Sequence, residues 1–243
     1  MQSQSSPLRS LTLSHLYNSL LQVSPDTLAK ALFPLTQVCL CLTTLGVKQL
    51  VSLAKAWAHS APTSLSVESD WGSWKLLPSK ILVPPFIRIT SLSLRGTKLL
   101  TDVVEGVLVA IAGGCAVKRL DLRGNDCSGV PGGIVRGAVL RLSVAVLTQC
   151  SLQLESVVPI LEDLANGDKG ELEELVVTKV HPGYDRPKEV KLLKWAKEGS
   201  ELHKLELHPS QWKCGDYTAA GIRAAVILDT LTFRNCFFYF GEI

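Results

Sequence analysis

Residues 117–127 read Val-Lys-Arg-Leu-Asp-Leu-Arg-Gly-Asn-Asp-Cys, with apolar residues at the first, fourth, sixth and eleventh positions and an asparagine at the ninth. The alternation of Leu120 and Leu122 with polar residues predicts a short strand with one buried face. Asn125 follows this strand. Its amide both donates and accepts, so it suits a turn whose backbone groups would otherwise lack partners.

The same pattern returns along the whole chain. Clear copies begin at Ile89 and Leu228, and weaker ones at Leu8, Leu35, Pro62, Leu142, Leu172 and Leu202. The nine starts near 8, 35, 62, 89, 117, 142, 172, 202 and 228 are 25 to 30 residues apart. A sustained period of this length indicates stacked repeats that share one core. We therefore expect a single domain over residues 1–243.

This pattern, LxxLxLxxN/CxL, resembles that of the leucine-rich repeat superfamily, and its long spacing resembles the ribonuclease-inhibitor-like class. The resemblance covers nearly the whole chain. It implies an α/β fold, a right-handed horseshoe solenoid with a parallel sheet on the concave side and helices on the convex side. Members of the superfamily are similar mainly in binding proteins, so a protein partner is implied and a reaction is not.

Small polar or thiol side chains recur at the ninth position of the repeat. We expect them to lie in buried turns and to bond to the backbone there. The clearest cases are Thr97, Asn125, Cys150 and Cys236.

Helix signals lie between the predicted strands. Ser24 and Pro25 are typical of a helix start before residues 28–32, and Thr101 opens a helix over 103–110. Further helices are predicted at 47–58, 154–165, 187–197 and 216–226. The glycine-rich segment 128–137 predicts a loop or a short, poorly formed helix.

The variable positions of each predicted strand point to the concave face. In the second half of the chain they combine charged residues with valines, as in a protein interface with an apolar centre and a charged rim. This candidate site comprises Arg119, Asp121, Val144, Val146, Glu174, Val176, Lys204 and Glu206. The alternative is a solvated sheet that binds nothing.

Composition argues against other partner classes. The net charge is +3, and no run of Lys and Arg is dense enough for a nucleic-acid or membrane site. The N-terminus lacks a secretory signal, and the longest apolar run, residues 32–47, is interrupted and follows the repeat period. Seven cysteines without paired spacing predict reduced thiols inside a cell, in the cytoplasm or the nucleus.

No stretch predicts catalysis, a metal or a cofactor. The five histidines form no ligand pattern, and neighbouring carboxylates such as Glu173 and Glu174 point to opposite faces of a strand. The function predicted is a non-enzymatic interaction module. By resemblance, its alternatives are the substrate-recognition arm of a ubiquitin ligase and the sensor repeats of an innate-immune receptor. An enzyme would require an activated cysteine or a metal.

The two ends have no polar segment that would cap a solenoid. An aromatic cluster, Phe233, Phe237, Phe238, Tyr239 and Phe240, makes the C-terminal end apolar. We therefore expect a fragment, an isoform or an incomplete gene model of a longer protein, or a chain that docks its end onto a partner. In either case we expect the isolated chain to self-associate through its uncapped ends.

Overall fold

The structure is a computed structural model. It describes residues 8–16, 18–68, 73–152, 156–157, 159–160, 163, 170–178, 204–208 and 230–233, with only the backbone at 178, 204–208 and 230–233. The predicted helices at 187–197 and 216–226, Cys236 and most of the aromatic cluster lie outside these residues. Only isolated positions of the predicted helix 154–165 are described.

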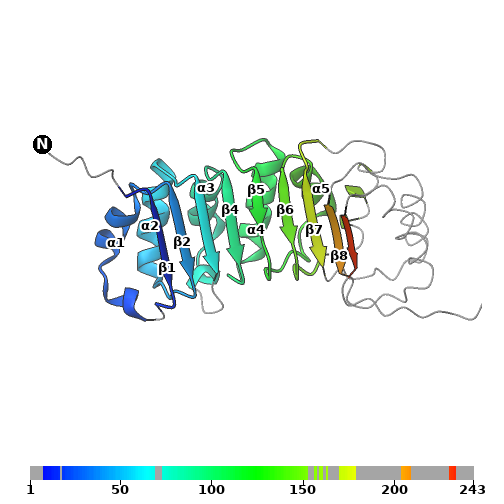
Figure 1. Cartoon of the computed structure of the whole chain (residues 1–243). Coiled ribbons are helices and arrows are strands. Elements are labelled where there is room, and N and C mark those ends of the chain that lie inside the picture. Colours follow the sequence, from blue (N-terminus) through cyan, green and yellow to red (C-terminus); the bar gives the residue numbers. More distant parts are fainter. Residues whose placement is uncertain are drawn as a thin grey trace, which may run out of the picture.

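The described strands form one parallel sheet in chain order (Figure 1). They are β1 (Ser10–Ser14), β2 (Gln37–Cys41), β3 (Ser64–Glu68), β4 (Ser91–Arg95), β5 (Arg119–Asp121), β6 (Val144–Leu147), β7 (Glu174–Thr178), β8 (Lys204–His208) and β9 (Thr230–Phe233). Each begins two residues after one of the starts read from the sequence. Equivalent positions pair directly, so that Ser91 lies beside Arg119 and Arg119 beside Val144.

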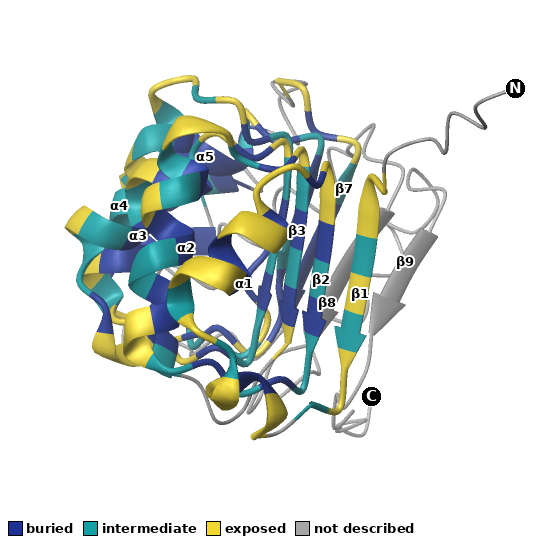
Figure 2. Ribbon diagram, turned by 90° about the vertical axis from the view of Figure 1, so that its left-hand side faces the viewer, coloured by how far each residue is buried: buried dark blue, intermediate teal, exposed yellow. Residues whose placement is uncertain are grey.

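Helices cover one face of this sheet (Figure 2). They are α1 (Pro25–Leu32), α2 (Val47–His59), α3 (Ser79–Phe86), α4 (Thr101–Ala112) and α5 (Gly132–Val139), with short 3-10 helices η1 (Ser19–Gln22) and η2 (Ser73–Leu76). Among the residues described, no helix has the length and apolar character needed to cross a membrane.

The core lies between the sheet and the helices. On β4, Leu92 and Leu94 are buried while the residues between and beside them are half-exposed, and β2 and β3 repeat this alternation. Trp57 of α2 and Phe86 of α3 are the largest side chains that are fully buried. Burial of these apolar faces holds each repeat against its neighbours, because one repeat alone cannot cover its own helix.

The predicted helix starts are confirmed for α1, α2 and α4. Ser24 Oγ accepts a hydrogen bond from the Thr27 amide at 3.2 Å, and Pro25 occupies the first helical position. Gln49 also fixes the start of α2: its Oε1 accepts from the Gly46 amide at 2.9 Å, and its Nε2 donates to the Val23 carbonyl at 2.7 Å.

Two helices differ, one only in part, from the sequence expectation. The glycine-rich segment contains α5, so the short-helix alternative is confirmed, but this 8-residue helix is well packed and buries Val135, Ala138 and Val139. Helix α3, at a place where no helix was predicted, carries prolines at 84 and 85 and is nevertheless helical because it buries Leu82 and Phe86. Tertiary packing therefore outweighs weak local propensity in both segments.

Candidate functional site

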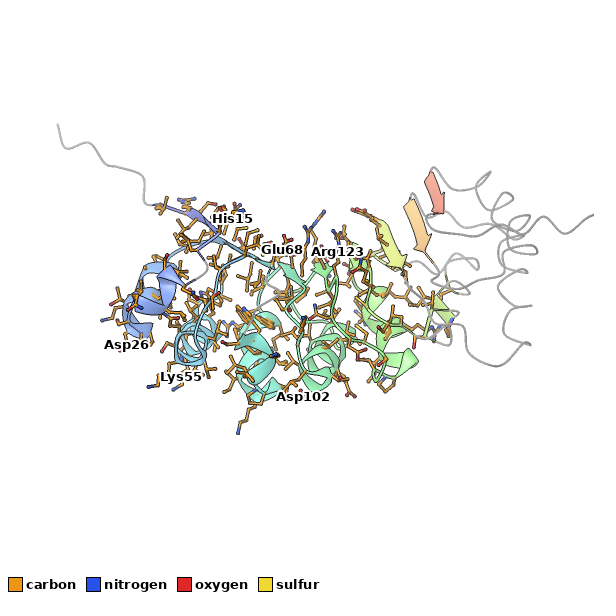
Figure 3. All side chains as sticks on the ribbon, turned by 90° about the horizontal axis from the view of Figure 1, so that it is seen from below. His15, Asp26, Lys55, Glu68, Asp102 and Arg123 are labelled. Carbon is orange, nitrogen blue, oxygen red and sulfur yellow. The ribbon has the colours of Figure 1, made fainter. Side chains whose placement is uncertain are left out.

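The sheet face opposite the helices, here called the open face, carries three rows of side chains. The first row contains Ser64, Ser91, Arg119, Val144 and Glu174, and the second contains Ser66, Ser93, Asp121, Val146 and Val176. The third follows at the carboxyl ends of the strands and contains Glu68, Arg95, Arg123 and Thr148. Figure 3 shows Glu68 and Arg123 on this side of the molecule, away from Lys55 and Asp102 on the helices.

The carboxylate of Asp121 is the centre of a polar network on this face. Its Oδ2 accepts from Arg95 Nε at 2.7 Å, and its Oδ1 accepts from the Arg123 amide at 3.0 Å. Arg123 Nε in turn donates to Thr148 Oγ1 at 2.9 Å. Adjacent strands thus fix the two guanidinium groups, whose side chains stay 41% and 45% exposed.

A repeated turn holds the third row in place. The residue at the eighth position of the repeat has a positive φ wherever it is described: His15, Leu42, Gly96, Gly124 and Gln149. Its amide donates to the third-row carbonyl of the next repeat, as in Gly96 to Arg123 at 2.7 Å and Gly124 to Thr148 at 3.0 Å. Glycine suits this conformation best because it has no Cβ to clash with the backbone.

The predicted turn residues form a buried ladder below these turns. Asn125 Nδ2 donates to the carbonyls of Leu94 and Leu122, the latter at 3.0 Å. Cys150 Sγ lies 3.1 Å from the same Leu122 carbonyl. Thr97 Oγ1 lies 3.0 Å from Asn125 Oδ1, so the ladder runs across three repeats. Cys236, the fourth predicted turn residue, lies outside the described residues.

The eight residues predicted for the partner site fall in two adjacent lines. Pairing joins Arg119, Val144, Glu174 and Lys204 in the first line, and Asp121, Val146, Val176 and Glu206 in the second. The structure describes only the backbone of Lys204 and Glu206.

The exposure of these residues differs from the sequence expectation. Asp121, expected at a charged rim, is buried because Arg95 and the Arg123 amide occupy its carboxylate. Val144 and Val176, expected as an exposed apolar centre, are only 8% and 7% exposed. Val146 and Glu174 are half-buried, and Arg119 is exposed.

The guanidinium of Arg119 differs from its neighbours. No hydrogen bond or ion pair joins it to another side chain in the part of the chain that the structure describes. A surface arginine without an internal partner keeps all its donors available for a ligand.

Sequence reasoning missed Arg95 and Arg123. Both stand in the same short motif, Leu-Arg-Gly, at 94–96 and 122–124. The glycine of that motif was the available signal, because a left-handed turn directly after an arginine marks the end of its strand.

The described residues give little basis for catalysis. No group of three His, Cys, Asp or Glu side chains among them is placed to hold a metal ion. Cys41 Sγ lies 3.9 Å from Glu68 Oε2, and burial together with that carboxylate raises the pKa of the Cys41 thiol. A raised pKa leaves little thiolate at neutral pH and makes this cysteine a poor nucleophile.

Comparison of the chain with protein-family models finds no match, and comparison with curated protein sequences finds none either.

Proposed function

We propose that the chain is a right-handed leucine-rich-repeat solenoid of the ribonuclease-inhibitor-like class, with the open face on the inside of its curve. Parallel strands in chain order with helices between them support this, because such crossovers are almost always right-handed. The buried ladder through Thr97, Asn125 and Cys150 supports it further, since these residues occupy the ninth position of the repeat pattern.

On this fold we propose a non-enzymatic module that binds a protein partner on the open face around Arg119. The observation that carries the proposal is the environment of this arginine. Its side chain is exposed and has no side-chain partner among the residues described, while the guanidinium groups of the neighbouring Arg95 and Arg123 both contact the Asp121 carboxylate. The charged groups next to Arg119 are therefore held in position before a ligand binds. This lowers the conformational entropy that is lost on binding.

The mixture of charges favours a protein over a nucleic acid. Arg95, Arg119 and Arg123 alternate with Asp121 and Glu68, so the face is not a uniformly positive track for phosphates. Beside them, the serines at 64, 66, 91 and 93 form a neutral strip of small side chains. Protein interfaces combine such polar areas with arginine anchors.

Charge reversal at Arg119 tests the proposal. The parent chain and the Arg119→Glu variant are each used to capture partners, which quantitative mass spectrometry identifies. Each captured protein is then purified, and its affinity for the parent chain and for the variant is measured by titration. We expect at least a tenfold loss of affinity, because an arginine that is a hot spot of an interface contributes about 2 kcal/mol or more.

The matched control is Lys55→Glu on α2, which makes the same charge change on the helix side of the molecule (Figure 3). It should leave binding unchanged, and both variants should keep the thermal transition of the parent. Loss of partners in the Lys55 variant, with retention in the Arg119 variant, would place the interface on the helices instead.

A further inference from the structure

Strand β1 is the first strand of the sheet and pairs, among the residues described, with β2 alone. In the described part of the chain its other side is therefore an edge whose backbone groups have no strand partner, and such an edge can pair with another strand. Charged residues and prolines usually block such pairing, and β1 contains neither in its sequence Ser-Leu-Thr-Leu-Ser.

The hydrogen bonds to β2 show which groups of β1 are engaged. The Arg9 carbonyl accepts from the Gln37 amide at 3.0 Å, and the His15 amide donates to the Cys41 carbonyl at 3.0 Å. In a parallel ladder alternate residues point both backbone groups to the same neighbour. The backbone amides and carbonyls of the odd-numbered residues therefore bond to β2. Those of Ser10, Thr12 and Ser14 point away from β2, toward the open edge.

The sequence of this edge is nearly symmetric about Thr12. Residues 8–16 read Leu-Arg-Ser-Leu-Thr-Leu-Ser-His-Leu, so each residue has the same type as its mirror position except for Arg9 and His15, which are both basic. A twofold interface brings a patch against a copy of itself, residue i facing j and j facing i. In an antiparallel pair centred on Thr12 this symmetry also places serine opposite serine and leucine opposite leucine.

We propose that β1 binds β1 of a second copy of this chain, antiparallel, around a twofold axis at Thr12. The outward groups of Thr12 then bond to Thr12 of the other copy, and those of Ser10 bond to Ser14. This register uses every outward group of the strand and disturbs no bond to β2. The two sheets join into one continuous sheet.

Side chains at this end fit the same arrangement. Leu11 and Leu13 are only partly buried against the core, and antiparallel pairing places each opposite the other in the second copy. Further apolar side chains are exposed in the same terminal repeat, with Leu8 at 65% and Leu21 and Phe33 at 43% each. A single paired strand with such flanks buries less than a standard interface, so the dimer is weak and depends on concentration.

This inference is independent of partner binding, because Arg119 lies on the fifth strand of the sheet and not at its edge. Exposed Ser10 and Ser14 allow a test of the register itself. In the proposed dimer each faces the other across the axis. In the native chain they pair with Gln37 and Cys41, which carry no formal charge.

Sedimentation velocity of the full chain, up to about 100 μM, should show a monomer–dimer equilibrium. The double variant Ser10→Lys with Ser14→Lys places like charges opposite each other and should weaken the dimer at least tenfold. The matched variant Ser10→Lys with Ser14→Glu places opposite charges there and should retain it. Circular dichroism and thermal unfolding should show that both variants stay folded.

Three results would overturn the proposal. The parent chain could sediment as a monomer at every concentration. The two-lysine variant could dimerise as well as the parent while folded. Equal loss of the dimer in both variants would also refute the register, because the antiparallel arrangement requires them to differ.

Discussion

Thr97 Oγ1 and Asn125 Oδ1 lie 3.0 Å apart, although 28 residues separate them in the chain. Both are only 1% exposed, and the same Asn125 oxygen accepts from the Leu99 amide at 3.0 Å. One side chain thus satisfies backbone groups in its own repeat and in the preceding one.

Removal of this amide should destabilise the fold. Asn125→Ala leaves the Leu99 amide buried without its partner and removes one of the two side-chain donors to the Leu94 carbonyl, so we expect a loss of about 1–3 kcal/mol in the free energy of unfolding. Urea denaturation measures it. Asn125→Cys should cost less, because Cys150 fills the equivalent place one repeat later. Equal destabilisation by the two variants would mean that a thiol at this position does not replace the amide.

Truncation of a core leucine to alanine should lower the free energy of unfolding more than truncation of the neighbouring arginine. Leu120 and Leu122 are at most 1% exposed, so Leu120→Ala or Leu122→Ala should lose about 2–5 kcal/mol through the cavity that forms. Arg119→Ala on the same strand should change stability by less than about 0.5 kcal/mol. Denaturant midpoints for these variants test the inward and outward assignment of β5 directly.

The turn glycine and a helix glycine should respond in opposite directions. Gly124 has φ +74°, where a Cβ is strained, so Gly124→Ala should destabilise by about 1 kcal/mol. A Cβ at Gly133 meets no atom within 4 Å, and its φ lies outside the left-handed region, so Gly133→Ala should stabilise by about 0.4–1 kcal/mol. Stabilisation by both substitutions would show that the entropy of the unfolded chain outweighs the strain at Gly124.

The strand register could be predicted from the sequence because it depends on local alternation. Leu92 and Leu94, or Leu120 and Leu122, mark the buried face of each strand without reference to any distant residue. The period then gives the pairing, since identical repeats can stack in only one register without exposing leucines. Helix α3 could not be predicted, because its stability comes from the burial of Leu82 and Phe86 and not from local helix signals.

The candidate site was only partly predictable for a similar reason. Strand alternation correctly places Arg119 and Asp121 on one face, but the burial of Asp121 depends on Arg95, 26 residues earlier. The third row, with Arg95 and Arg123, is defined by left-handed turns at Gly96 and Gly124. No rule that considers only the apolar positions of a repeat identifies it.

Disruption of the Asp121 network should weaken partner binding without unfolding the chain. Asp121→Asn keeps an oxygen for the Arg123 amide but removes the charge that holds Arg95. Because Arg95 is 41% exposed and screened by solvent, the expected loss of stability is at most about 1 kcal/mol. Affinity for a purified partner should fall, since the guanidinium groups would lose their fixed positions. An unchanged dissociation constant would show that the partner does not contact Arg95 or Arg123.

High pH should destabilise the protein through Cys150. Its thiol has an ordinary pKa of 9.0, and in the folded chain the hydrogen bond with Cys127 and burial raise the pKa far above that value. Above about pH 9 the unfolded chain therefore binds fewer protons than the native one, and stability falls by up to about 1.4 kcal/mol per pH unit from this group. Below that pH its contribution is fully present.

Cys150→Ser retains a donor for the Leu122 carbonyl but does not ionise in this range, so the stability of this variant should decline less steeply between about pH 9 and 10.5. Urea denaturation in the presence of a reductant measures both slopes, and parallel slopes would show that Cys150 ionises as readily in the folded chain as in the unfolded one.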